Sequence, residues 1–450
     1  MIKGAFNNTN IFKVIHVSAR LMEAISVNEA IKQGTGLVKL HGWAYRERKS
    51  KEIVFIVLRD SSNIIQCVAK KSNLTEEEWK QAETILIESS LELEGEIRAD
   101  KRAPTGYEVE IKKLNVIGRA DNFPINKDQS PEFLLDNRHL WLRSRKLTSV
   151  MKIRSTVFRA IHEFFQSKGY FEAHAPIFTP SGCEGGATLF EVKYFNEKAY
   201  LTQSWQLYAE AMIASLEKIY TIGPCFRAER SKTSRHLAEF WMAEMEAAWL
   251  KLEDVMEVSE ELIEHIVQAV LKENEEELKL LERDLEKLKK IKRPFNRMTY
   301  KEAVELLQKD GIEIEFGKDL RTIEEDKLME KFDKPLLVSR YPKEIMAFYK
   351  PADPNDNSVA LNFDMLAPEG YGEIVGGSQR EEDIDKMKNK LIHDGEKVEN
   401  YEWYFDTRRY GNVPHSGFGM GVERIIAWVC GLDNIKDAIA FPRTMTRNKP

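Results

Sequence analysis

Arginine, carboxylate and aromatic side chains alternate through residues 223–249, GPCFRAERSKTSRHLAEFWMAEMEAAW. We expect a strand that continues through 226–230, a loop at SKTSRH and a returning strand. Arg227 and Glu229 then face the same side, because side chains two apart on a strand do so. Further side chains share one face of the returning strand: Phe240, Met242, Glu244 and Glu246. Guanidinium groups suit phosphate and an aromatic ring suits a nucleobase. The hairpin therefore favours phosphate binding, with a charged surface hairpin as the alternative.

Two carboxylates flank a Gly/Pro turn in residues 362–381, NFDMLAPEGYGEIVGGSQRE. From two strands, Asp364 and Glu373 could hold a divalent cation that carries phosphates. Arg380 follows on the second strand and could clamp an anionic or carbonyl group. The alternative is that all of them are surface residues of a hairpin.

A glycine-rich segment, VPHSGFGMGVERIIAWVCGL at 413–432, leads into an apolar helix that ends near Gly431. Arg424 lies in the first helical turn and can reach back over the glycines. The third glycine of a dinucleotide fingerprint is missing and no βαβ context is apparent, which disfavours a Rossmann site. The alternative to a ligand site is a helix start that packs closely on a strand.

Another glycine-rich loop, SGCEGG at 181–186, surrounds Glu184 and is a plausible lid. The helix that begins in QSWQLYAE carries amide and hydroxyl groups, which at a helix start are usually caps. Cys183 has no base that the sequence places beside it, so we expect an inert thiol rather than a nucleophile.

The elements that position these residues predict an α+β fold with two domains. Residues 36–118 read as five short strands with one helix at 74–90, before the penultimate strand, which matches an OB-type barrel or another small β-barrel. Residues 1–35 form an N-terminal extension and 119–148 a polar connector. A long helix at about 149–168 opens a second domain, 149–450, of alternating strands and helices. The charged segment 259–292 predicts a long amphipathic helix or helical hairpin packed on its own domain, with a partner-binding coiled coil as the alternative.

Composition narrows the class of protein. Of 450 residues, 42% are hydrophobic and 31% charged, which excludes a largely disordered chain. The net charge of -6 argues against a DNA-coating protein, and no apolar run is long enough to span a bilayer. The cysteines at 67, 183, 225 and 430 form no CxxC pair, so a disulfide framework and a structural zinc site are not expected. The N-terminus lacks the apolar core of a secretory signal. We expect a soluble cytoplasmic protein with no DNA or membrane partner.

In this order, the segments resemble the class II aminoacyl-tRNA synthetases of the aspartyl/asparaginyl branch, over roughly residues 36–450. GYFEAHAPIFTPS, with Pro176, resembles the first motif of the family, FRAE…RHLAEF the second and GFGMGVER the third. The resemblance implies an OB-fold domain that binds the tRNA anticodon. It further implies a catalytic domain built on a mainly antiparallel sheet flanked by helices, and a homodimer through the first motif.

The resemblance also implies the chemistry and its residues. Asparagine would attack the α-phosphate of ATP, giving asparaginyl-adenylate, and tRNA would then accept the amino acid, with Mg²⁺ present and no covalent enzyme nucleophile. Catalysis would fall to Arg227, Glu229 and Arg424. ATP would be held by Arg227, Glu229, Arg235, His236, Phe240, Glu373 and Arg424. Mg²⁺ would be held by Asp364 and Glu373. The amino acid would be held by Glu184, Gln206, Glu210, Arg380 and His415.

The substrate side chain follows from one short difference. Aspartyl enzymes carry QSPQLYKQ, whose lysine meets the second carboxylate oxygen, and this chain reads QSWQLYAE. Ala209 removes that cation and Glu210 adds an acid, so an amide is favoured over a carboxylate. The alternatives are an aspartyl enzyme, including a non-discriminating one that charges both tRNAs, a tRNA-free asparagine synthetase on the same fold, and a non-catalytic nucleic-acid-binding protein.

The resemblance places an anticodon reader on the barrel. The spacing of Phe55 and Gln66 is similar to that of an aromatic residue that stacks on the central uridine and a glutamine that bonds to it. Arg46 would join them, and Arg48 and Arg59 could contact the backbone of the tRNA. The alternative is that Phe55 belongs to the barrel core.

Overall fold

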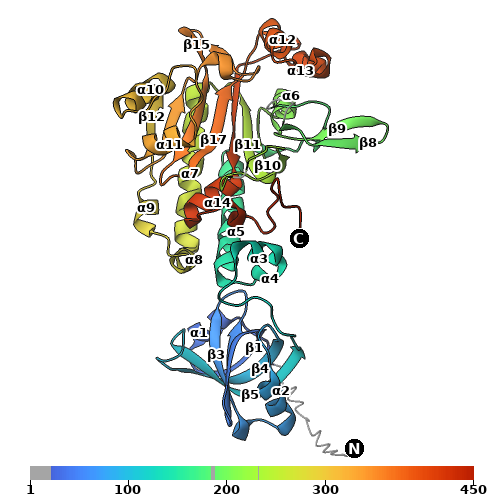
Figure 1. Cartoon of the computed structure of the whole chain (residues 1–450), viewed down its shortest axis with the longest axis vertical. Helices are drawn as coiled ribbons and strands as arrows, with labels where there is room; N and C mark the ends of the chain where they lie inside the picture. Colours follow the sequence, from blue (N-terminus) through green and yellow to red (C-terminus); the bar gives the residue numbers. More distant parts are fainter. Residues whose placement is uncertain (1–21, 184–187, 232) are drawn as a thin grey trace, which may run out of the picture. The chain divides into compact units, whose positions relative to one another are not determined.

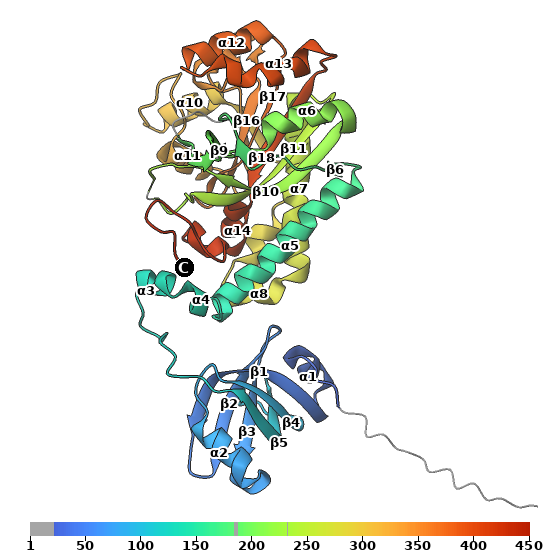
Figure 2. The same ribbon diagram turned by 90° about the vertical axis from the view of Figure 1, so that its right-hand side faces the viewer.

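The computed structural model describes residues 22–183, 188–231 and 233–450. The chain divides into two compact units, one that ends at Gln129 and one that spans Ser130–Pro450 (Figures 1 and 2). Of the predicted connector, 119–129 therefore lies with the first unit and 130–148 with the second. No helix in the described ranges is both long and apolar enough to cross a membrane.

The first unit is a closed five-stranded barrel. Its strands are β1 (Gly36–Lys49), β2 (Ile53–Arg59), β3 (Ile64–Lys70), β4 (Ser90–Ala99) and β5 (Tyr107–Gly118), in the order β1-β2-β3-β5-β4. Helix α2 (Glu76–Thr84) lies between β3 and β4, as the OB-type prediction requires. Buried and outward side chains alternate along β2, so Val54, Ile56 and Leu58 face the core. A short helix, α1 (Val27–Gln33), precedes the barrel and is capped by Ser26.

The second unit is built on an eight-stranded sheet in the order β12-β13-β16-β17-β18-β11-β10-β6. Only the β12–β13 and β10–β6 pairs are parallel, which confirms the prediction of a mainly antiparallel sheet. The strands are β6 (Phe171–Glu172), β10 (Lys218–Phe226), β11 (Glu239–Ala248), β12 (Asn296–Thr299), β13 (Leu336–Ser339), β16 (Asn362–Ala367), β17 (Gly372–Gln379) and β18 (His415–Gly421).

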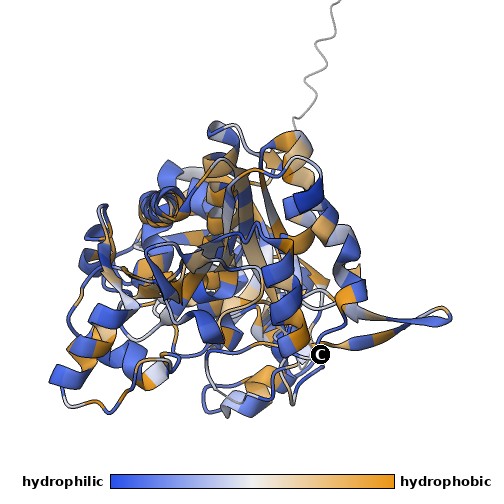
Figure 3. Cartoon of the chain, turned by 90° about the horizontal axis from the view of Figure 1, so that it is seen from above, coloured by the Kyte–Doolittle hydropathy of each residue, from blue (hydrophilic) through white to orange (hydrophobic). Residues whose placement is uncertain are grey.

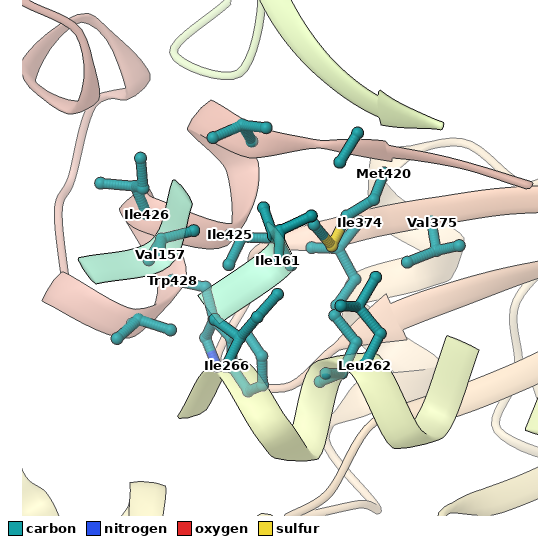
Figure 4. Close-up of a cluster of buried hydrophobic side chains, with 14 of the residues drawn as sticks. Val157, Ile161, Leu262, Ile266, Ile374, Val375, Met420, Ile425, Ile426 and Trp428 are labelled. Carbon is teal, nitrogen blue, oxygen red and sulfur yellow. The ribbon is translucent and has the colours of Figure 1, made fainter. Parts of the chain in front are cut away.

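Three helices cover one face of this sheet and form the main core. They are α5 (Arg145–Ser167), α7 (Leu252–Glu273) and α14 (Val422–Cys430). Their apolar side chains meet those of β17 and β18, as Figure 4 shows for Ile161, Leu262, Ile425, Ile374 and Met420. Burying each such side chain stabilises the fold by about 1.5–3 kcal/mol. Helix α5 begins earlier than predicted because Ser144 caps it, accepting from the Leu147 N–H.

The charged segment 259–292 forms the end of α7 and two short helices, α8 (Glu275–Leu280) and α9 (Leu285–Lys289), rather than one long helix or a simple hairpin. Leu278 and Leu288 are buried in the core of the same unit. This packing agrees with a solvated helical segment that folds onto its own domain. Polar colours predominate on the peripheral helices in Figure 3, whereas apolar colours gather on the inner elements.

Part of the predicted connector is folded. Helices α3 (Pro131–Asp136) and α4 (Arg138–Trp141) lie before α5. The Arg138 guanidinium is fully buried and donates to the carbonyls of Lys436, Ile439 and Ala440 and to Asp437. Its acceptors lie about three hundred residues away in sequence, so local polarity gave no sign of this anchor.

The remaining elements surround the open face of the sheet. A small three-stranded sheet consists of β7 (Phe178–Thr179), β9 (Glu197–Leu201) and β8 (Glu191–Tyr194). A separate hairpin consists of β14 (Ala352–Asp353) and β15 (Asp356–Ala360). The helices are α6 (Gln206–Leu216), α10 (Tyr300–Lys309), α11 (Thr322–Met329), α12 (Ile384–His393) and α13 (Glu402–Arg409).

Candidate active site

A cavity of about 840 Å³ opens on the face of the sheet opposite α5 and α7. Its walls come from β11, β16, β17, β18, the start of α6 and residues 344–350. The alternation of β11 explains the polarity: Ala243 and Ala247 pack in the core, whereas Glu244 and Glu246 line the cavity. The shared face predicted for this strand is therefore the cavity face.

A smaller cavity adjoins it and contains every residue predicted to hold ATP. Its lining includes Arg227, Glu229, Arg235, His236, Phe240, Glu373 and Arg424. Arg227, Met242 and Glu373 line both cavities, so the two form one cleft. We call the smaller cavity the nucleotide end of the cleft and the region around Gln206 and Arg380 the amino-acid end.

Arg227 lies just beyond β10, because that strand ends at Phe226 instead of continuing to 230 as predicted. The Arg227 N–H still donates to the Ala238 carbonyl (3.0 Å), which keeps the hairpin together. The guanidinium carbon lies 5.5 Å from the centre of the Phe240 ring, within cation–π range. A cation and a ring therefore lie close together in the lining of one cavity.

Glu229 and His236 meet across the loop that follows Arg227. The His236 Nε2 lies 3.5 Å from a Glu229 carboxylate oxygen. Burial lowers the pKa of His236, and Arg424, Arg227 and Arg235 act in the same direction, while Glu229 opposes them. Three arginines that all disfavour protonation of His236 give this region positive charge, which suits an anionic ligand.

Arg235 is held by α11 and by the turn before β17. Its guanidinium donates to Asp326 (2.8 Å) and to the Gly370 carbonyl, and lies 3.7 Å from Glu325. Burial, followed by repulsion from Glu373, raises the pKa of Glu325 to about 7. Arg235 therefore lines the nucleotide end while bonded to protein groups.

Arg424 and the two predicted metal ligands lie side by side. The Arg424 guanidinium donates to the Glu373 carbonyl (2.7 Å) and carboxylate (3.2 Å). Asp364 pairs in register with Gly376, and a Cβ at Gly376 would stand 3.0 Å from Glu373 Oε1 and 3.4 Å from Asp364 Oδ1. The two carboxylates therefore flank one small space. Burial, then repulsion from Glu373, raises the pKa of Asp364 well above its usual range. Two oxygen donors that repel one another fit a divalent cation.

At the amino-acid end, Arg380 is almost fully buried against Glu246. Its Nη2 donates to Glu246 Oε2 (2.7 Å), its Nε approaches both carboxylate oxygens and its Nη1 donates to Ser378 (2.8 Å). A side chain at Gly417 would meet Glu246 Oε2 at 2.1 Å and Arg380 at 2.7 Å. Gly417, the first glycine of the third motif, is therefore needed for this ion pair. It lies on β18 rather than on a phosphate-binding loop.

Glu210 forms the centre of a second buried network. Its carboxylate accepts from Gln206 (2.9 Å), Tyr404 (2.7 Å) and Arg408, and the His415 Nε2 lies 3.0 Å away. Burial opposes ionisation, but Arg408, His415 and Arg380 outweigh it and hold the pKa of Glu210 below its usual range. Gln206 and Arg380 line the cavity, whereas Glu210 and His415 lie behind them.

Sequence reasoning missed part of this site. Tyr404 and Arg408 lie on α13, almost two hundred residues from Glu210; only their spacing of four residues, which puts them on one helical face, could have indicated a pair. Glu244 lines the cavity and accepts from the Ser204 hydroxyl and the Trp205 N–H (3.1 Å). It belonged to the predicted strand face, but the sequence assigned it no role.

Two further sites were predicted, one on the glycine-rich loop 181–186 and one on the barrel. Glu184 lies outside the described residues. On the barrel, Phe55 is half-buried on the outer face of β2, so the alternative of a core residue is wrong. Phe55, Gln66, Arg46 and Arg48 line one groove of about 480 Å³.

Contacts within that groove hold its polar side chains in place. The Arg48 guanidinium lies 4.7 Å from the Phe55 ring centre, and Gln66 donates to Glu108 (3.0 Å). Arg59 is not part of the groove lining and instead forms a two-point ion pair with Glu88.

Comparison with known proteins gives consistent matches for both units. A family model described as tRNA synthetases class II (D, K and N) matches residues 130–445, and one described as an OB-fold nucleic acid binding domain matches 38–117. Asparagine–tRNA ligases of Thermoplasma acidophilum and Thermococcus gammatolerans are 48% and 51% identical over 413 residues, 92% of this chain and 96% of each relative. The asparaginyl-tRNA synthetase of Pyrococcus horikoshii, in a crystal structure with asparaginyl-adenylate, matches with a TM-score of 0.92 and 47% identity, over 96% of this chain and 100% of that chain.

Proposed function

We propose that this chain, which belongs to the class II tRNA synthetases of the aspartate, lysine and asparagine group, joins asparagine to its tRNA. An asparagine carboxylate oxygen attacks the α-phosphorus of ATP and pyrophosphate leaves. A hydroxyl of the terminal tRNA ribose then attacks the activated carbonyl and AMP leaves. The observation that carries the proposal is the single cleft, with a phosphate- and ring-binding end beside a buried arginine.

At the nucleotide end, the chain neutralises and orients phosphates. Arg227 binds the α-phosphate, where negative charge develops during attack, and Phe240 with Arg424 sandwiches the adenine. Glu229 accepts from the adenine amino group, while Arg235 and His236 face the outer phosphates. Arg227, Glu229 and Arg424 thereby place the reacting atoms, and catalysis rests on this positioning together with charge neutralisation.

The carboxylates of Asp364 and Glu373 would hold Mg²⁺. The ion would supply charge neutralisation for the pyrophosphate that leaves. The donor set fits, since both carboxylates flank Gly376 and repel one another.

At the amino-acid end, Arg380 donates to the side-chain oxygen of asparagine, and Gln206 lies beside it. The basic groups there already bond to carboxylates: Arg380 to Glu246, and Arg408 to Glu210. A substrate carboxylate would find no further cation, whereas an amide NH₂ can donate to these acidic groups. The positions of Glu210 and His415 behind the cavity make them positioning residues.

Glu244 suits the ammonium group of the substrate. Its carboxylate faces the cavity from β11 and is held by Ser204 and the Trp205 N–H. Glu184, on the glycine-rich loop 181–186, is a second candidate for the same ammonium group.

The barrel reads the anticodon in this proposal. Phe55 stacks on a base of the single-stranded loop, Gln66 bonds to its edge, and Arg46 contacts a phosphate. An outward aromatic ring beside two arginines supports this role.

The protein acts as a homodimer in the cytoplasm. Strand β6 is an edge strand, and Phe171, Ile177 and Phe178 near it are 57%, 43% and 52% exposed, which favours a second copy over solvent. All four cysteines lie in the described part of the chain as buried thiols outside any disulfide, which suits a reducing compartment.

The direct test is aminoacylation of a tRNA transcript that carries the asparagine anticodon, with labelled asparagine, ATP and Mg²⁺. We expect an ester-linked asparaginyl-tRNA and no charging when the anticodon is changed to that of aspartate. Formation of free asparagine from aspartate, ammonia and ATP, without any charging, would instead support the tRNA-free synthetase.

A further inference from the structure

Helix α6 separates a polar face from an apolar face within its first turn. Gln206 and Glu210 are one turn apart and bond to each other on the polar face. Trp205 and Ala209, also one turn apart, lie in an apolar cluster with Ile213 and with residues of neighbouring segments. The members of that cluster are Ala173, Trp205, Ala209, Ile213, Ile219 and Ala248. Positions 209 and 210 therefore face different surroundings, although they are adjacent.

The Trp205 side chain is the largest member of this apolar cluster and is 5% exposed. In the described part of the chain its indole Nε1 has no hydrogen-bond partner. The main chain of Trp205 is fixed at both ends, because its N–H donates to Glu244 and its carbonyl accepts from the Ala209 N–H (3.2 Å). Trp205 also lines the cavity. Trp205 therefore belongs both to the cavity lining and to the apolar cluster.

Ala209 lies one helical turn after Trp205, is completely buried and belongs to the same apolar cluster. In a helix, Cα–Cβ bonds tilt toward the N-terminus, so a long side chain at 209 would extend over position 205. The buried indole packs in the cluster around position 209, and close-packed interiors do not accept additional atoms without a shift. An ammonium group placed there would also be buried among apolar side chains.

We propose that Trp205 and Ala209 act together as a specificity-determining pair, in which the indole excludes any long cationic side chain from the amino-acid end. The inference rests on the proposed function, since it explains why a substrate carboxylate finds only Arg380. It goes beyond the sequence comparison at 209 and 210, because it predicts that position 209 cannot be changed alone. Asparagine selectivity then depends on packing as well as on charge.

The steric part is tested by thermal unfolding of the full chain in four variants: A209M, W205A, W205A/A209M and the unchanged protein. We expect A209M to lower the unfolding temperature by several degrees and W205A/A209M to unfold at or above the temperature of W205A. Ala214 is exposed on the same helix, so A214M and W205A/A214M are the matched controls and should show additive effects. Additive effects for A209M and W205A would overturn the pairing.

The specificity part is tested by ATP–pyrophosphate exchange with aspartate and asparagine. We expect A209K alone to gain no aspartate activity, and W205A/A209K to raise the aspartate-to-asparagine ratio at least tenfold. Equal gains in both variants would overturn the proposal. If A209K fails to fold while W205A/A209K folds, the exclusion by Trp205 is supported, and if neither folds, the methionine variants decide. Loss of exchange with both amino acids in the unchanged protein would contradict the proposed function alone, because the unfolding measurements use no substrate.

Discussion

The two ends of the cleft are built in opposite ways. At the nucleotide end, the side chains of Arg424, Glu229 and His236 are 30%, 32% and 36% exposed and each bonds to a neighbour that a ligand could replace. At the amino-acid end, the side chains of Arg380, Glu246 and Glu210 are at most 4% exposed and their contacts are protein contacts. Groups at the first end can exchange partners when phosphates arrive, whereas groups at the second end are fixed before the substrate enters.

The two ends of the cleft therefore differ in how much stability the loss of an ion pair costs. Exposed ion pairs contribute about 0–1 kcal/mol and are readily exchanged, whereas removing one partner of a buried pair costs about 3–5 kcal/mol. The nucleotide end is therefore suited to charge that develops during the reaction, and the amino-acid end to selection by shape and hydrogen bonding.

The largest effect is expected at the nucleotide end. R227A should lower the rate of ATP–pyrophosphate exchange by about 10³-fold, because the charge that develops at the α-phosphate loses its guanidinium partner. R227K is the matched control and should retain part of the activity through its charge. Unfolding temperatures of both variants should stay close to that of the unchanged protein. A loss of only a few-fold in R227A would remove Arg227 from the catalytic step.

The comparison itself is tested by one glutamine substitution at each end. E246Q leaves the buried Arg380 without its carboxylate and should reduce the free energy of unfolding by about 3–5 kcal/mol, measured by denaturant titration. E229Q, the control, should change the free energy of unfolding by no more than about 1 kcal/mol while weakening the binding of ATP. Equal destabilisation by the two variants would mean that the ends do not differ as described.

Glu210 at the amino-acid end is expected to contribute to the choice between asparagine and aspartate. E210Q keeps the shape but removes a negative charge that lies 3.8 Å from the Arg380 guanidinium. A substrate carboxylate at Arg380 is then disfavoured less, so the preference for asparagine over aspartate should fall about tenfold, equivalent to about 1.4 kcal/mol. Parallel KM and kcat measurements for both amino acids give the ratio. An unchanged ratio would show that the network behind the cavity has no part in selection.

Low pH should destabilise the fold through the same buried network around Glu210. The pKa of Glu210 is lower in the folded chain than in the unfolded chain, so its ionised form stabilises the fold above the unfolded pKa. This contribution is lost as the pH falls through the folded pKa. The unfolding temperature of the unchanged protein should therefore decrease more steeply below pH 5 than that of E210Q. Parallel curves for the two proteins would contradict this assignment.

The smallest effect on adenylate formation is expected from the barrel. F55A should leave ATP–pyrophosphate exchange unchanged but reduce tRNA charging about tenfold, since stacking of one base contributes about 1–3 kcal/mol. Leu37, an apolar residue of β1 that is 62% exposed, provides the control L37A, for which both rates should be unchanged. A loss of exchange in F55A, or a loss of charging in L37A, would argue against base stacking.

The sequence predicted those parts of the molecule that depend on local periodicity. Alternation along 239–248 placed Glu244 and Glu246 on one face, and five short runs with one helix indicated a small β-barrel. Phe240 and Arg424 were found because their motifs lie next to a strand and a helix start. In these segments the chain specifies its structure within about twenty residues.

Contacts between distant residues could not be predicted in this way. Arg408 reaches Glu210 across the fold, and Arg138 is anchored by the C-terminal segment. The end of β10 at Phe226 was also missed, because Arg227 keeps a main-chain hydrogen bond to Ala238 after the strand has ended. The packing of Trp205 and Ala209 in one apolar cluster could not be predicted either, because a sequence pattern does not show how much space surrounds a side chain.

The most direct test of the account is ATP–pyrophosphate exchange with asparagine and aspartate side by side, in the presence of Mg²⁺ and without tRNA. A cleft whose arginines already bond to carboxylates should support exchange with asparagine and little or none with aspartate. Exchange with aspartate alone would contradict the assignment of the amino-acid end, and silence with both would contradict the assignment of the cleft as an adenylate-forming site.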